Sequence, residues 1–127
     1  MKTNKELLQL ALKTKWFNLI KNGEKKEEYR EIKPYWISRF IRNEDGTRIK
    51  KNDAITLSNN VDLLNLLVRN RKKILIPFKE IHFTRGYNPN GAFTCEVLNI
   101  RIDTGIEEWG AARGKYYFVF EIKKLTF

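Results

Sequence analysis

The chain has 127 residues, of which 42% are hydrophobic and 13% aromatic, and this composition excludes a disordered polypeptide. The length suits a single domain over residues 1–127 with one core. The 25 lysines and arginines against 15 acidic residues give a formal net charge of +10. A surplus this large favours a polyanionic partner, nucleic acid first, and the simpler alternative is that the charge only aids solubility.

A single cysteine, Cys95, excludes an intramolecular disulfide and favours a reducing compartment. The N-terminal residues lead into only six mostly apolar residues, Leu7 to Leu12. That run is too short for the core of a signal peptide or for a membrane span. We therefore expect a cytoplasmic protein that has no membrane partner.

The first element along the chain is open to two interpretations. The alternating leucines of Leu7–Leu12 suit a buried strand, whereas the same residues can extend the following helix back to Asn4. Thr14 is suited to be the N-cap of that helix, which has an apolar face at helical spacing. Asn22-Gly23 supplies the left-handed residue that ends it.

A strand and a second short helix follow. Residues alternate from Lys26 to Ile32, which places Glu28 and Arg30 on the same side of the predicted strand. Pro34 is well suited to the first turn of a helix that continues from Tyr35 to Ile41.

The middle of the chain predicts a turn at Asn43–Gly46, a strand at Ala54–Leu57 and a helix at Val61–Val68. The basic run that follows, Arg69 to Lys73, suits either a phosphate-binding track or a solvated helix end.

The last part of the chain predicts strands separated by turns. A strong turn at Asn88–Gly91 places Thr84 and Phe93 on either side of a hairpin. Early helices followed by late strands predict an α+β domain, a small and mostly antiparallel β-barrel with two or three short helices around it. The predicted strands are Ile74–Ile76, Ile81–Thr84, Phe93–Ile102 and Tyr116–Lys123.

The segment Gly23–Arg30 brings charged residues together where the first helix gives way to its strand. Lys25 offers a point charge for a phosphate, and Arg30 can contact a phosphate or a base edge with two donors. Glu28 is equally consistent with a purely structural role, in which it holds Arg30 by an ion pair.

The pattern Gly23-x-Lys25-x-x-Glu28-x-Arg30 resembles the signature of the ASCH family, whose members have a PUA-like β-barrel. The resemblance implies a cleft between barrel and helices that binds RNA or a nucleoside-like ligand, with Lys25, Glu28 and Arg30 on its wall. Further segments resemble the family in the expected order, from about Leu7 to Phe120. They are Lys15-Trp16-Phe17, Lys33-Pro34-Tyr35-Trp36, Arg85-Gly86-Tyr87 and Glu108-Trp109-Gly110-Ala111.

These segments contribute further candidates for ligand binding, namely Lys15, Arg85, Tyr87 and Trp109. Tyr87 and Trp109 lie beside glycines in predicted loops, so we expect them to be exposed enough to stack on a base. Core packing is the expected role of the tryptophans on the apolar helix faces, Trp16 and Trp36.

The alternative function is that of a hydrolase acting on acylated nucleosides or RNA. Some proteins with this motif hydrolyse acetylated cytidine with a lysine, a threonine and a glutamate, and others are ribonucleases. Lys25 stands where that lysine is expected, but Glu28 replaces the threonine, and a carboxylate cannot repeat the role of an activated hydroxyl unchanged. Lys25 and Glu28 remain candidates for an acid–base pair.

Nothing in the sequence predicts a metal or a cofactor. His82 has no partner at metal-ligand spacing, so a structural role in its strand is expected, and Cys95 is expected to be a buried apolar residue. Neither a glycine-rich phosphate loop nor a dinucleotide fingerprint is present. The sequence leaves the ligand, the catalytic role and the oligomeric state open.

Overall fold

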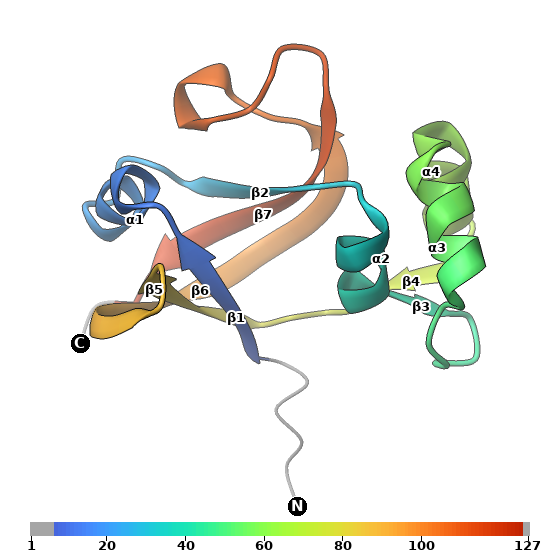
Figure 1. The fold of residues 1–127 in the computed structure, drawn as a ribbon, viewed down its shortest axis with the longest axis horizontal. Coiled ribbons are helices and arrows are strands. Elements are labelled where there is room, and N and C mark those ends of the chain that lie inside the picture. The colour runs from blue at the N-terminus through green and yellow to red at the C-terminus, as the bar shows by residue number, and fades with distance from the viewer. Residues whose placement is uncertain (1–6, 126–127) are drawn as a thin grey trace, which may run out of the picture.

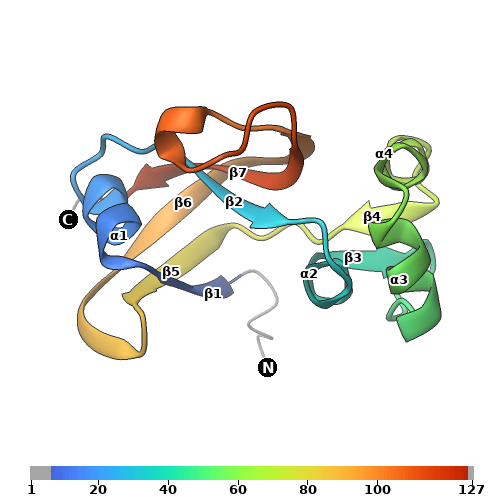
Figure 2. The ribbon, with the colours of Figure 1, turned by 45° about the horizontal axis from the view of Figure 1, so that its top comes forward.

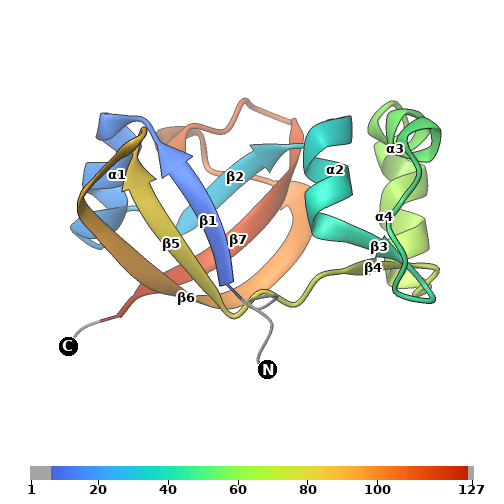
Figure 3. The same cartoon turned by 60° about the horizontal axis from the view of Figure 1, so that its bottom comes forward.

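A strongly curved sheet of five strands forms a half-barrel in the computed structural model, which describes residues 7–125 (Figure 3). The first pair of strands is parallel and the other three pairs are antiparallel. The α+β class and the mostly antiparallel sheet are therefore as predicted. In sheet order the strands are β1 (Leu7–Leu12), β5 (Glu80–Arg85), β6 (Asn88–Thr104), β7 (Tyr116–Lys124) and β2 (Glu27–Glu31).

The two N-terminal strands, β1 and β2, are the two edges of this sheet. Helix α1 (Thr14–Lys21) connects them and packs the buried side chains of Phe17 and Ile20 against the barrel interior. The strand interpretation of Leu7–Leu12 is thus confirmed, and Asn4 lies outside the described residues. The interior consists of alternating side chains from the strands, including Leu8, Leu10, Leu12, Ile81, Phe83, Phe118, Phe120 and Ile122.

A helical lobe, residues 34–75, stands beside the half-barrel (Figure 1). Phe40 joins the two parts, because its ring packs edge-on against the rings of Phe118 and Phe120 at centroid distances of 5.2 and 5.1 Å. The lobe contains α2 (Pro34–Phe40), β3 (Ile41–Asn43), α3 (Lys51–Ser58), α4 (Val61–Arg69) and β4 (Lys73–Leu75). Strand β4 pairs with β3 in a separate sheet and not with the strands of the half-barrel, although its sequence is rich in apolar residues as theirs is.

Residues Ala54–Leu57 are helical, so the predicted strand there is wrong. Ala54 and Leu57 are the buried residues of α3, and their spacing of three places them on one helix face. The run has too few apolar residues to distinguish the alternation of a strand from the spacing of a helix. The next helix begins as predicted at Val61, where the side chain of Asn60 accepts a hydrogen bond from the amide of Leu63.

The hairpin between β5 and β6 turns two residues earlier than predicted. Gly86 and Tyr87 form the turn, and Asn88 already pairs with Arg85. The run Asn88–Gly91 is therefore part of β6, and the pairing of β5 with β6 shifts in register between Phe83 and Arg85 to accommodate it.

Thr14 is the first residue of α1 and not its N-cap. Lys13 holds that position, with extended backbone and no capping hydrogen bond from its side chain. The C-terminal end of the helix is as predicted, since Gly23 has a φ of 81°.

Between residues 7 and 125, no helix combines the length and the apolar character needed to cross a membrane.

Two neighbouring side chains test the helical assignment of α3. In a strand Ile55 and Leu57 would share a face, whereas in α3 the exposed fractions are 40% for Ile55 and 4% for Leu57. We expect Leu57→Ala to lower the free energy of unfolding by about 2–5 kcal/mol. The matched change Ile55→Ala should cost less than about 1 kcal/mol. Urea denaturation of both variants measures the difference, and equal losses would contradict the helix.

Candidate functional site

The turn after α1 folds the motif back beneath the helix. Gly23 has a φ of 81°, a conformation that glycine adopts without strain. The amides of Glu24 and Lys25 both donate to the carbonyl of Leu19, at 2.9 and 3.0 Å. These bonds direct the chain inward, so that Lys25 at the entry to β2 is only 2% exposed.

Glu28 lies between the two cations of the motif. Its Oε1 is 2.5 Å from Nζ of Lys25, and its Oε2 is 2.8 Å from Nη2 of Arg30. Glu28 itself is 5% exposed, so both contacts form in a largely desolvated setting. The structure thus brings the three motif residues together and points the two cations inward. The ion pair in which Glu28 holds Arg30 is therefore present.

Arg30 also spans the gap between the sheet edges. Its Nη2 donates to the main-chain carbonyl of Ala11 in β1 at 3.0 Å, so one side chain of β2 reaches the opposite edge strand. The guanidinium carbon lies 5.1 Å from the ring centroid of Trp36 in α2, a cation–π contact. Within residues 7–125 the buried Nε of Arg30 has no hydrogen-bond partner.

The charge of Lys25 is opposed by burial. Desolvation lowers the pKa of Lys25 below its ordinary value, and the carboxylate of Glu28 offsets part of that effect. The ammonium also faces two aromatic rings, with Nζ 5.2 Å from the centroid of Tyr29 and 5.5 Å from that of Trp16. Burial therefore disfavours the charged form of the amine relative to water, whereas the two aromatic rings attract it.

The loop between β6 and β7 lies beside α1 and β2 (Figure 2), and it contacts Trp16 and Tyr29, which flank the amine. It contains the short helix η2 (Glu107–Trp109), after which Gly110 has a φ of 104°. A Cβ on Gly110 would come within 2.9 Å of the Trp16 ring, so the loop packs closely against α1 only because residue 110 is glycine. Tyr29 anchors the start of the loop, since its hydroxyl accepts from the amide of Ile106 at 2.9 Å.

Lys15 and Trp109 lie near the contact between the β6–β7 loop and Trp16. Nζ of Lys15 is 4.7 Å from the ring centroid of Trp16, and Trp109 precedes the glycine that contacts the same ring. Trp109 is half-buried, so it is less accessible than its place in a loop predicts. Trp16 packs against the core as expected and also faces the amine of Lys25, which the sequence did not indicate.

Arg85 and Tyr87 lie on the β5–β6 hairpin, beside α1 (Figure 3). Arg85 pairs with Leu12, the residue that follows the carbonyl contacted by Arg30. Tyr87 is fully exposed at the turn, in agreement with the prediction, and no described residue packs on its ring. The hairpin thus places a cation and an uncovered aromatic ring beside the end of β1, where Arg30 of β2 bonds to that strand. We call this place the seam between β1 and β2.

Neither His82 nor Cys95 belongs to this group of residues. Nδ1 of His82 is 3.1 Å from the hydroxyl of Thr94, which gives it the expected structural role in the sheet. Cys95 is buried, and burial raises the pKa of its thiol to about 11. Among residues 7–125, no three His, Cys, Asp or Glu side chains are grouped so that they could hold a metal ion.

The depressed pKa of Lys25 has a consequence for stability. Between that pKa and 10.5 the unfolded chain binds more protons than the folded chain at this position. The contribution of Lys25 to the free energy of unfolding therefore rises with pH in that interval. We expect the stability difference between wild type and Lys25→Met to shift in favour of wild type as the pH rises, as measured by urea denaturation.

The exposed Lys50→Met is the matched control for this experiment, because it removes the same charge from the start of α3. An equal pH slope for the two variants would contradict an effect specific to the buried amine.

Comparison with known proteins identifies no relative of this chain. No protein-family model matches the sequence, and no curated protein or solved structure is significantly similar to it.

Proposed function

We propose that this chain is an RNA- or nucleotide-binding domain of the ASCH type, with a PUA-like fold, and that it binds its ligand at the seam between β1 and β2. Lys25, Glu28 and Arg30 form the base of this site, and its margins are Lys15, Arg85, Tyr87 and Trp109. Three features support the proposal: the motif, the curved half-barrel and the net charge of +10.

The observation that carries the proposal is that the side chain of Arg30 is held in one position by its neighbours. Its guanidinium is fixed by Glu28, by the carbonyl of Ala11 and by the ring of Trp36, so little side-chain entropy is left to lose on binding. All of its hydrogen bonds to described residues come from Nη2, which leaves Nη1 for a ligand, whereas Nε is buried. A prepositioned guanidinium with free donors suits a phosphate or the edge of a base.

Tyr87 supplies the complementary interaction for a nucleic acid. A fully exposed ring at a hairpin turn can stack on an unpaired base, whatever the identity of that base. The adjacent Arg85 places a positive charge where the phosphate backbone would run. The proposal therefore favours single-stranded segments of RNA over duplexes.

Replacing the guanidinium while keeping its charge tests the role of Arg30. We expect Arg30→Lys to weaken binding of a fluorescein-labelled single-stranded RNA about 10- to 100-fold, because a charged hydrogen bond contributes about 1.5–3 kcal/mol. Arg39→Lys is the matched control, since Arg39 is an exposed arginine whose one partner among the described residues is Tyr35. Fluorescence anisotropy measures both affinities, and affinity should also fall steeply as salt rises.

Tyr87→Ala provides a second variant whose effect on folding should be negligible, because the side chain is fully exposed. Loss of stacking should weaken RNA binding by about 1–3 kcal/mol, and Tyr87→Phe should restore it. Tyr116→Ala removes another exposed tyrosine and serves as the control. Absence of RNA binding by the wild type, or an affinity that is independent of salt, would refute the proposal.

A hydrolase remains the second candidate function, favoured by one observation. Lys25 has a depressed pKa and contacts a carboxylate, an arrangement that suits general acid–base catalysis. We expect this function, if present, to give product from acylated nucleosides or short RNAs, and to disappear in Lys25→Ala. Chromatography of the products measures turnover, and circular dichroism shows whether the variant is folded. No product from the wild type would exclude the hydrolase for the substrates tested.

A further inference from the structure

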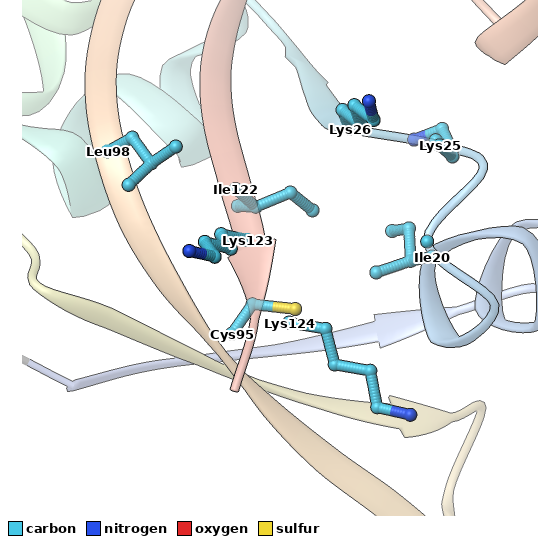
Figure 4. Close-up of a pocket in the computed structure, with 9 residues that line it drawn as sticks. Ile20, Lys25, Lys26, Cys95, Leu98, Ile122, Lys123 and Lys124 are labelled. Carbon is cyan, nitrogen blue, oxygen red and sulfur yellow. The ribbon is translucent and has the colours of Figure 1, made fainter. Parts of the chain in front are cut away.

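A separate pocket of about 410 Å³ opens at the end of α1, between the beginning of β2 and the strands β6 and β7 (Figure 4). Its volume lies in the range of small-molecule sites. We propose that it binds a small amphipathic anion, a molecule with an apolar body and a carboxylate or a similar anionic head. The pocket is lined by Ile20, Gly23, Lys25, Lys26, Cys95, Leu98, Ile122, Lys123 and Lys124.

The inner wall of the pocket is apolar. Ile20 from α1 and Ile122 from β7 project toward the same space, and the sulfur of Cys95 lies beside them (Figure 4). All three are buried core residues, so the wall is continuous with the hydrophobic interior. Because these three side chains are already almost fully buried, the apolar surface that a ligand would remove from water belongs mainly to Leu98 at the rim.

An irregularity in the sheet supplies the outer part of this wall. The pairing of β6 with β7 shifts between Val97 and Asn99, so Leu98 is an extra residue in β6. Its side chain is 59% exposed and nevertheless lines the pocket. The bulge thus places an exposed leucine at the rim of the pocket, where an apolar ligand body could cover it.

Three lysines surround the apolar wall, namely Lys26, Lys123 and Lys124. None of them forms a salt bridge within residues 7–125, even though Glu96 pairs with Lys123 in the sheet register. Unneutralised cations around an apolar surface are complementary to a ligand with one anionic end. The lysines therefore favour a ligand with a negative charge, and the apolar wall favours a ligand with an apolar body.

This pocket shares one residue, Lys25, with the proposed RNA site. Lys25 lines it, but the ammonium of Lys25 is already bonded to Glu28, and its side chain is almost fully buried. Neither Arg30 nor Tyr87 is among the lining residues. Binding of an amphipathic anion can therefore be tested, and can succeed or fail, independently of RNA binding.

Competition with a fluorescent anion tests the proposal. We expect 1-anilinonaphthalene-8-sulfonate to fluoresce on binding the wild type, and dodecanoate below its micelle concentration to displace it. Dodecanol, which has the same apolar body without the charge, should displace it far less well. The double change Lys123→Gln/Lys124→Gln should weaken dodecanoate binding about five- to tenfold, as expected for the loss of two exposed ion pairs. Leu98→Ser should also weaken it, because it removes part of the wall.

The matched control removes two adjacent exposed lysines elsewhere, in Lys50→Gln/Lys51→Gln, and should leave dodecanoate affinity unchanged. Melting temperatures of all variants show that the fold is retained. Failure of dodecanoate to displace the probe from the wild type would overturn the proposal. Equal displacement by dodecanol, or equal effects of the two double variants, would overturn it as well.

Discussion

The carboxylate of Glu28 is the contact on which the arrangement of this site depends. One oxygen bonds the buried amine of Lys25 and the other bonds Arg30, so a single side chain compensates two cations in a desolvated place. Without it, burial of Lys25 would leave an uncompensated charge, which proteins rarely tolerate. The same carboxylate orients Arg30 toward Ala11, so that the electrostatics of the motif and the closure of the half-barrel have one origin.

Packing of the surrounding elements follows from this contact. Trp16 in α1 and Trp36 in α2 face the cations from two different helices, and the loop before β7 fits against Trp16 through Gly110. The site is therefore assembled from segments that are far apart in the chain but meet where α1 and α2 flank β2. Both functions considered for this site draw on the same feature, a cation held in place before any ligand arrives.

Much of this architecture could be predicted from the sequence, because alternation and turn residues identify most elements. The two-residue period of β2 places Glu28 and Arg30 on one side of the strand, and Gly23 marks the end of α1. The assignment of Ala54–Leu57 failed because four residues do not distinguish two periodicities, and packing of α3 against α2 decides the outcome. The contact of Arg30 with Ala11 could not be predicted, because it depends on how far the sheet curls and on a main-chain atom that no side-chain pattern reveals.

That main-chain atom has an evolutionary consequence. A carbonyl oxygen is present whichever amino acid occupies position 11, so the bridge to β1 does not constrain the side chain there. All of the sequence specificity of the bridge resides at position 30, where few side chains other than arginine could reach both the carbonyl and the carboxylate. Related chains that keep this closure should therefore vary freely at one end of the bridge and hardly at all at the other.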